Sequence, residues 1–281
     1  MLTTYFKRMK KNWLIGVVPP LFCILFIPII AMIWPELKTQ AEAFSAILEN
    51  DIYKIMLGDL AEGMFTTWQG MIVMYVFIWI DFILIFITIF MPVGIISSEV
   101  DKRTLDVTLS YPIPRWKYLL EKYLVYLSFQ LLYPILVGTS MIIFSDFMQE
   151  PMNSGTIFLA FAGVWLKFFA LGSLTFLCAA LFLNTNRSMA AAALVVLGSY
   201  IGERLSMLVA SAGGVYGDVG NFIANLSMFH YLTAGNIQNW TREPMEVLLE
   251  NFIPEFLVLF GVGIGALTLA LFVFERRELA Y

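Results

Sequence analysis

Long apolar stretches alternate with shorter polar segments along the whole chain. A bilayer core about 30 Å thick needs about 20 mostly apolar residues for each helix that crosses it. Six stretches meet that requirement, and they cover roughly residues 13–34, 71–96, 118–144, 156–183, 188–210 and 252–274. The pattern therefore predicts an all-α membrane protein with six transmembrane helices, which form a single transmembrane domain over residues 1–281.

The segments outside these stretches have patterns of their own. Residues 1–12 place apolar side chains at helical spacing opposite basic ones, which is typical of an amphipathic helix in the lipid headgroup layer. Two long segments, 35–70 and 211–251, join spans on the side away from the termini. Within the second, residues 219–241 carry no charge but too many polar groups for lipid, so we expect an outer loop or a re-entrant structure buried in protein.

Composition and charge restrict the protein class and the orientation. Hydrophobic residues make up 60% of the 281 positions and charged residues only 14%, against about 25% in soluble domains, which excludes a soluble globular enzyme. Cytoplasmic loops carry an excess of Lys and Arg. Twelve of these residues lie on the side of the termini and four on the other side, so we predict that both termini are cytoplasmic. The twelve are Lys7, Arg8, Lys10, Lys11, Lys102, Arg103, Arg115, Lys117, Lys122, Arg187, Arg276 and Arg277.

Two charged residues, Asp81 and Lys167, interrupt otherwise apolar spans. Both lie about 15–17 Å from the start of their spans at 1.5 Å per residue, so they share a depth near the membrane midplane. A charge there is costly and marks a functional candidate. The pair could join two helices, or it could line a cargo pathway. Glu203, Arg204 and Glu255 lie near the outer boundary, where they could line an exit or reach the interface.

Other features of the sequence bear on packing and chemistry. Gly261 and Gly265 form a GxxxG pair in the last span, which predicts close helix packing. The only histidine is His230, and no motif for metal binding, nucleophilic catalysis or nucleotide binding occurs. We therefore expect no enzyme activity, no cofactor and no nucleic-acid partner for this chain. If ATP is used, another chain must bind it.

The loop of residues 98–117, between the second and third spans, has the clearest local pattern. A helix is expected to leave the membrane at Glu99, and a short amphipathic helix follows at about 102–110, where Leu105 and Leu109 share one face. Pro112 ends that helix, and Pro114 suits the first turn of the next one. A short helix across the membrane face can carry force from a soluble partner into the bundle.

This loop resembles that of the type-2 permeases of ATP-binding-cassette (ABC) transporters. The resemblance rests on an ordered set of residues, Glu99, Thr104, Leu105, Leu109, Pro112, Arg115 and Lys122. Arg103 stands where the family usually has glycine, and Val100 where it usually has an acidic residue. The chain's ending, from Phe274 to Leu279, is also similar to the family's, so the resemblance covers the whole chain.

The resemblance implies a coupling helix that docks on a separate nucleotide-binding subunit. Asn186 and Arg187, in the short loop between the fourth and fifth spans, would form a second contact. Two permease copies would pair with two ABC ATPases, which would bind ATP and Mg, and the complex would export an unidentified substrate across the plasma membrane. The alternative is a stand-alone secondary transporter that uses Asp81 and Lys167 as an ion or proton relay.

Overall fold

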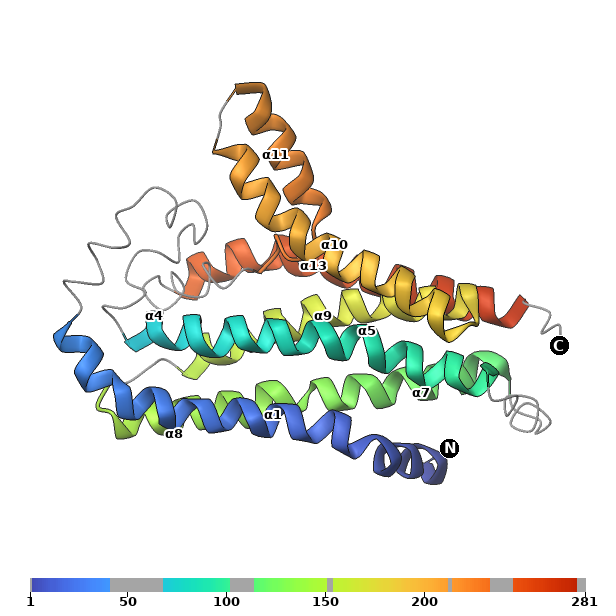
Figure 1. Ribbon diagram of the computed structural model, residues 1–281, viewed down its shortest axis with the longest axis horizontal. Helices are drawn as coiled ribbons and strands as arrows, with labels where there is room; N and C mark the ends of the chain where they lie inside the picture. Colours follow the sequence, from blue (N-terminus) through green and yellow to red (C-terminus); the bar gives the residue numbers. More distant parts are fainter. Residues whose placement is uncertain are drawn as a thin grey trace.

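The computed structural model describes residues 2–40, 68–101, 114–150, 154–211, 214–232 and 245–276. Every regular element in these ranges is a helix (Figure 1). Among the described residues, six helical segments are long and apolar enough to cross a membrane: Asn12–Thr39, Gly70–Ser97, Arg115–Phe147, Ser154–Phe182, Thr185–Ala210 and Phe252–Arg276. They coincide with the six predicted stretches, which confirms the all-α prediction.

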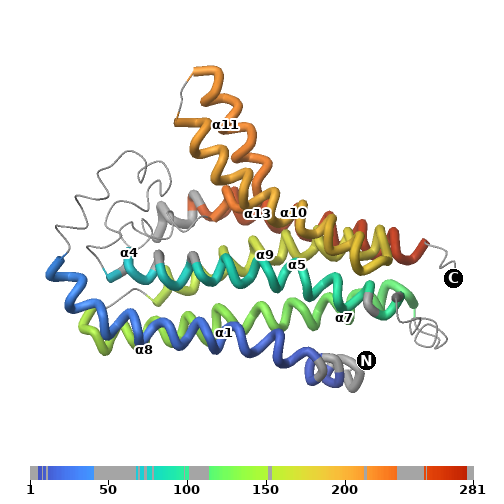
Figure 2. The backbone as a smooth tube through the Cα atoms, viewed as in Figure 1, coloured from blue at the N-terminus to red at the C-terminus, as the bar shows by residue number. Residues whose placement is uncertain are grey.

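The first three spans contain α1 (Leu2–Thr39), α4 (Trp68–Ile72), α5 (Ile78–Asp101), α7 (Arg115–Gln130) and α8 (Gly138–Phe147). Five-residue π-helical turns, η2 (Val73–Phe77) and η3 (Tyr133–Val137), connect the helical pieces of the second and third spans. The remaining elements are α9 (Ser154–Phe182), α10 (Thr185–Ala210), α11 (Gly214–Leu226) and α13 (Met245–Arg276). The backbone path in Figure 2 brings the start of α1 and the end of α13 to the same end of the bundle, called the terminal end below.

Helix α9 is the central helix of the bundle. It packs against α5, α10 and α13, and its most apolar window is the most buried of the six spans. Glycines allow close contacts of α9 with α7 and α13, because a small residue at the interface lets a neighbouring helix approach. A Cβ built on Gly172 would lie 2.3 Å from the Tyr126 ring, and one built on Gly263 would lie 2.2 Å from the Phe169 ring.

The N-terminal segment differs from the expected separate interfacial helix. Its residues are helical from Leu2, but they continue without interruption into the first span as α1. No glycine or proline occurs between residues 2 and 12 to end the helix there. Pro35 does not end the helix either, since α1 runs on to Thr39.

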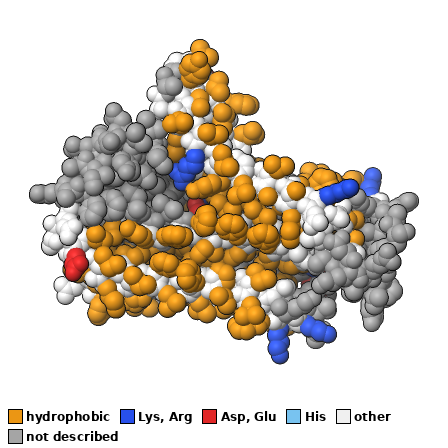
Figure 3. All heavy atoms as spheres, viewed as in Figure 1, with side chains coloured by type: hydrophobic (Ala, Val, Ile, Leu, Met, Phe, Trp, Pro, Cys, Tyr) orange, Lys and Arg blue, Asp and Glu red, His pale blue; other side chains and the backbone are white. Residues whose placement is uncertain are grey.

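The last part of α10 and the whole of α11 form a hairpin that projects away from the other helices, whereas the first part of α10 runs along the bundle (Figure 1). The two helices approach closely at Gly220, where an added Cβ would lie 2.6 Å from the backbone nitrogen of Ala210. Apolar side chains cover much of the hairpin and of the bundle face in Figure 3. The run 219–241, predicted to be a loop or a re-entrant structure, is thus helical as far as Leu226, and residues 233–244 lie outside the described residues.

Within the described part of this chain, Gly261 and Gly265 of the GxxxG pair do not pack against another helix. Nothing lies within 4 Å of a Cβ built on Gly261 or on Gly265. The glycine that packs closely is Gly263, against Phe169 of α9. The three glycines are two residues apart, so consecutive ones lie on different faces of α13. Gly263 faces α9, whereas Gly261 and Gly265 face away from it.

Candidate functional site

The two intramembrane charges lie in contact. Lys167 Nζ in α9 is 3.1 Å from Asp81 Oδ2 in α5, and only 1% of Lys167 is exposed. The Lys167 ammonium also lies 5.2 Å from the centre of the Phe229 ring, a favourable cation–π distance. Asp81 Oδ1 is buried and has no hydrogen-bond partner among the described residues.

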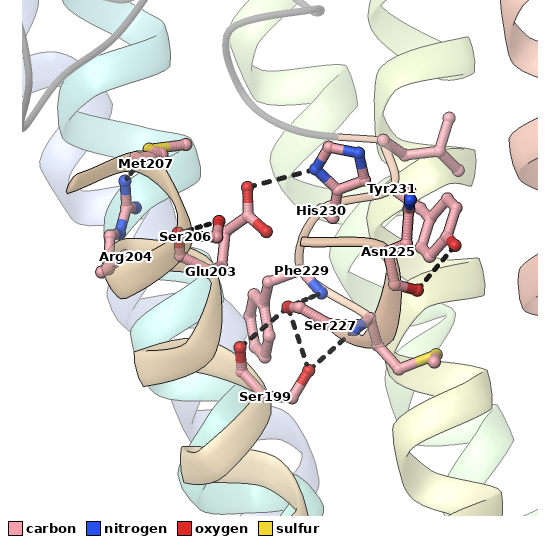
Figure 4. A network of polar contacts seen from close by, with 12 residues as sticks. Ser199, Glu203, Arg204, Ser206, Met207, Asn225, Ser227, Phe229, His230 and Tyr231 are labelled. Atoms are coloured by element: carbon pink, nitrogen blue, oxygen red, sulfur yellow. Dashed lines mark hydrogen bonds and ion pairs between the residues drawn. The ribbon is translucent and has the colours of Figure 1, made fainter. Parts of the chain in front are cut away.

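The turn of residues 227–232, called the seated turn below, follows α11 and lies against the bundle (Figure 4). Ser227 Oγ donates to the backbone oxygen of Ser199 in α10 at 2.8 Å, and Ser199 Oγ accepts from the backbone N–H of Met228 at 2.7 Å. Ser227 Oγ also accepts from the N–H of Phe229 at 3.1 Å. Two serines on separate elements thereby satisfy backbone groups that an irregular segment would otherwise leave unpaired.

A buried carboxylate beside this turn faces the chain's single histidine. His230 Nδ1 lies 3.4 Å from Glu203 Oε1, and Glu203 is 4% exposed (Figure 4). Glu203 Oε2 has no hydrogen-bond partner within the part of the chain that the structure describes. The hydrogen bond to Glu203 raises the pKa of His230 above its ordinary value of 6.5, against the opposing effect of burial. The carboxylate therefore favours the protonated imidazolium.

The last residue of the seated turn connects to two further helices. The backbone N–H of Leu232 donates to Glu255 Oε2 in α13 at 2.5 Å. The Leu232 side chain packs on Gly163 of α9, where an added Cβ would lie 3.2 Å from Leu232 Cβ. We call Asp81, Lys167, Glu203, His230 and Glu255 the central cluster. Its members come from α5, α9, α10, the seated turn and α13.

The structure thus brings together three of the four intramembrane candidates, Asp81, Lys167 and Glu203. The fourth, Arg204, points away: its guanidinium lies 5.5 Å from the Tyr200 ring and its Nη1 is 4.0 Å from Met207 Sδ (Figure 4). Sequence reasoning assigned no role to His230. The signal that could have found it is its place in a polar, charge-free run, because buried polar segments usually contact other polar groups.

A second polar cluster lies where the second and third spans meet the loop of residues 98–117. Lys122 Nζ is 2.8 Å from Glu99 Oε2 and donates to the backbone oxygen of Ile95 at 2.6 Å. The Tyr118 hydroxyl donates to the same Glu99 oxygen, and the Lys122 ammonium lies 4.6 Å from the centre of the Tyr118 ring. We call Glu99, Tyr118 and Lys122 the loop-base cluster. It joins the end of α5 to the start of α7.

Burial changes what Lys122 can do. The residue is completely buried, so it cannot touch a soluble partner in this conformation. Arg115 is the first residue of α7, and the Pro114 carbonyl before it accepts from the N–H groups of Lys117 and Tyr118 at 3.1 and 3.3 Å. The remaining predicted coupling residues lie outside the described residues, namely Arg103, Thr104, Leu105, Leu109 and Pro112.

The two residues of the predicted second contact, Asn186 and Arg187, lie in the first turn of α10, at the same end of the bundle as the loop-base cluster. Asn184 caps this helix, because its Oδ1 accepts from the N–H of Arg187 at 3.1 Å. Asn186 and Arg187 are exposed. Next to them, Ser188 Oγ accepts a 3.2 Å hydrogen bond from Ser97 Oγ, which joins α10 to α5.

The side chains of these clusters suit charge pairing rather than metal binding. The described residues contain no group of three or more His, Cys, Asp or Glu residues that could hold a metal ion. Cys23 and Cys178 are free thiols within apolar helices. The geometry holds ion pairs inside the bundle, and one of them links the two spans that border the 98–117 loop.

Comparison with known proteins gives one match. A family model described as "ABC-2 family transporter protein" matches residues 6–279. No curated protein and no solved structure matches the chain significantly. The match covers all six membrane-spanning helices and both polar clusters, and the chain is therefore a membrane protein of the ABC-2 transporter family.

Proposed function

We propose that this chain is the permease subunit of an ATP-driven exporter, and that a separate nucleotide-binding subunit hydrolyses the ATP. The observation that carries the proposal is the family match over residues 6–279, in a chain with no phosphate-binding motif of its own. ABC-2 permeases generally work with ATP-binding subunits. ATP and Mg would bind in that partner, and two permease copies would assemble with two ATPases.

The terminal end is the cytoplasmic end in this proposal. The positive-inside rule supports this orientation, since Lys and Arg are concentrated in the segments there. Figure 3 shows several of these side chains at the end of the bundle where α1 begins and α13 ends. Basic residues in the first turns of α1 would face anionic headgroups, as an interfacial helix does.

The loop-base cluster is proposed to transmit force from the ATPase. Residues at about 102–110 would form the docking helix, and Glu99 and Lys122 flank the loop on α5 and α7. Because Lys122 is buried and bound to Glu99 and Ile95, a displacement of the loop moves both helices together. Lys122 is thus a positioning residue, and the apolar face of Leu105 and Leu109 is the contact itself.

A double substitution in the loop tests the proposal. Leu105→Asp with Leu109→Asp places two charges on the docking face, and the matched control Leu105→Met with Leu109→Met keeps that face apolar. We expect the tagged wild type and the Met variant to retain an ABC ATPase through purification and to stimulate its ATP hydrolysis. The Asp variant should reach the membrane but lose the ATPase.

Retention of the ATPase and of coupled hydrolysis in the Asp variant would contradict the docking assignment. The competing function is a stand-alone secondary transporter with Asp81 and Lys167 as the relay. It requires transport by the lone chain that continues after ATP is depleted while an ion gradient is maintained. ATP dependence of transport in membrane vesicles therefore separates the two functions.

A further inference from the structure

We propose that His230 and Glu203 form a proton-binding site, and that a proton bound there latches the seated turn onto the helix bundle beside the Asp81–Lys167 pair. The inference rests on contacts within one chain, so it does not depend on whether ATP drives the transporter. It assigns a role to the chain's only histidine, which the proposed function leaves unused.

The seated turn is held by polar contacts and by two buried apolar side chains, Phe229 and Leu232. Its hydrogen bonds to Ser199 of α10 and Glu255 of α13 involve backbone N–H groups and one serine hydroxyl. Its apolar contacts are with α9, through Leu232 on Gly163 and the Phe229 ring at 5.9 Å from that of Phe168, and with α10, where the Phe229 ring lies 5.3 Å from that of Tyr200. Because the turn has no regular secondary structure of its own, we expect it to open locally at a lower free energy than the helices beneath it.

Charged side chains reach the turn from three helices. Glu203 of α10 and Glu255 of α13 lie close enough to raise the pKa of His230, and Lys167 of α9, which is paired with Asp81 of α5, lies against Phe229. Arg204 of α10 is turned away toward Tyr200. With neutral His230, Glu203 has no ion-pair partner among the described residues, because Lys167 is paired with Asp81. A proton on His230 supplies the second positive charge and gives Glu203 a partner.

The burial of Glu203 explains why this proton matters. The residue is 4% exposed, and one of its carboxylate oxygens lacks a hydrogen-bond partner among the described residues. Figure 4 shows its carboxylate directed at the His230 ring across the gap between α10 and the turn. An ionised carboxylate at such a position is costly unless it is paired. The imidazolium can pair with it only while the turn is seated.

The direction of the pH dependence follows from linkage. The seated turn raises the pKa of His230 above 6.5, whereas a released turn would return it to about that value. Protonated His230 therefore contributes its full stabilisation of the seated turn below pH 6.5. This stabilisation is lost as the pH rises through the raised pKa of His230. Each unit by which the pKa is raised changes the ratio of seated to released turn by about tenfold.

Release of the turn would uncover the central cluster. Phe229 lies against Lys167, and Leu232 lies on the α9 surface four residues away, so both leave together with the turn. The Asp81–Lys167 pair would then face the compartment on the side of the α10–α11 hairpin. A proton on His230 keeps this access closed.

A disulfide can report whether the turn is seated. Gly163→Cys with Leu232→Cys, in a background with Cys23→Ala and Cys178→Ala, places two Cβ atoms 3.2 Å apart, close to the separation of about 3.5–4.5 Å in disulfides. Cross-linking of the purified, detergent-solubilised chain is followed between about pH 5 and pH 9, which brackets histidine titration. His230→Gln removes the titrating group. The matched control Tyr231→Phe removes a neighbouring hydrogen bond, to the Asn225 carbonyl, without changing charge.

Thiol reactivity changes with pH in every variant, so the yield is expressed relative to the His230→Gln variant at each pH. We expect this ratio to be high in acid and to fall as the pH rises through the raised pKa of His230. The Tyr231→Phe variant should keep the same pH profile. A ratio that does not change with pH overturns the proposal.

Hydrogen exchange provides a measurement on the unaltered chain, in case the cysteine pair disturbs packing. The amides of Met228, Phe229 and Leu232, corrected for intrinsic exchange, should be protected in acid and lose protection as the pH rises. Amides of the α10 core around Val196 should not follow this titration. Uniform protection of the turn across the range also overturns the proposal.

Discussion

Lys122 Nζ lies 2.8 Å from Glu99 Oε2, and this contact joins α7 to α5 at the two borders of the loop that is proposed to meet the ATPase. The partners differ in environment, because 1% of the Lys122 side chain and 26% of the Glu99 side chain are exposed. Removal of either partner should therefore have unequal effects. The residue left behind decides the cost.

Glu99→Gln strands the buried Lys122 ammonium without its carboxylate, which we expect to cost about 3 kcal/mol, as for other broken buried pairs. Lys122→Met leaves Glu99 with partial access to water and with the Tyr118 hydroxyl, so its cost should be smaller. Thermal unfolding of the purified variants measures the difference. Lys117→Met, an exposed lysine in the same helix, is the control and should leave the midpoint unchanged. Equal losses for the two cluster variants would contradict this account.

A second prediction concerns the glycines of α13. Gly263→Ala would place a methyl group 2.2 Å from the Phe169 ring. That ring cannot move away easily, because it stacks on Trp165 and Phe260 and is buried. We expect a destabilisation of about 1–3 kcal/mol, typical of overpacking.

Gly261→Ala and Gly265→Ala are the matched controls for this substitution. Neither position has an atom of the described chain within 4 Å of the added carbon, and alanine favours a helix over glycine by about 0.5–1 kcal/mol. Both variants should therefore keep or slightly raise the unfolding temperature of the detergent-solubilised chain. A loss at Gly261 or Gly265 that appears only in the bilayer would locate a contact with another chain there.

The glycines show what sequence could and could not establish. The apolar pattern was sufficient to predict all six spans, because bilayer thickness fixes their length. The GxxxG motif identifies small residues but not the face that α13 turns inward, which depends on packing against α9. The burial of Lys122 could also have been predicted, because Tyr118, Lys122 and Tyr126 recur at four-residue spacing and therefore share one face of a helix. The structure shows that this face is buried.

In the central cluster, too, the sequence was sufficient to predict one contact but not another. Equal depth and opposite charge were enough to expect a contact between Asp81 and Lys167, because depth in a straight helix follows from the residue count. His230 could not be placed, since its position depends on where α11 ends and on how the following turn folds back to α9 and α10. Such a return over a short irregular segment has no periodic signal in sequence.

The last prediction concerns the Asp81–Lys167 pair itself. Asp81→Asn leaves Lys167, with a side chain only 2% exposed, as an unpaired charge inside the bundle. Lys167→Met strands Asp81, which already has one unpartnered oxygen among the described residues. Each single substitution should lower yield and the unfolding temperature, by an amount that corresponds to about 3–5 kcal/mol for a broken buried pair.

The double variant Asp81→Asn with Lys167→Met carries no charge at either position, so we expect it to be more stable than at least one single variant. A double-mutant cycle on the unfolding temperature, with ATPase stimulation measured in parallel, gives the coupling between the two residues. Strong coupling in stability, together with full ATPase stimulation by the double variant, assigns the pair to helix packing. Strong coupling in stability with loss of stimulation or transport places it on the cargo path. Simple additivity would contradict a direct pair, and each charge would then need a water-filled surrounding of its own, because neither side chain can reach the membrane surface from the middle of its span.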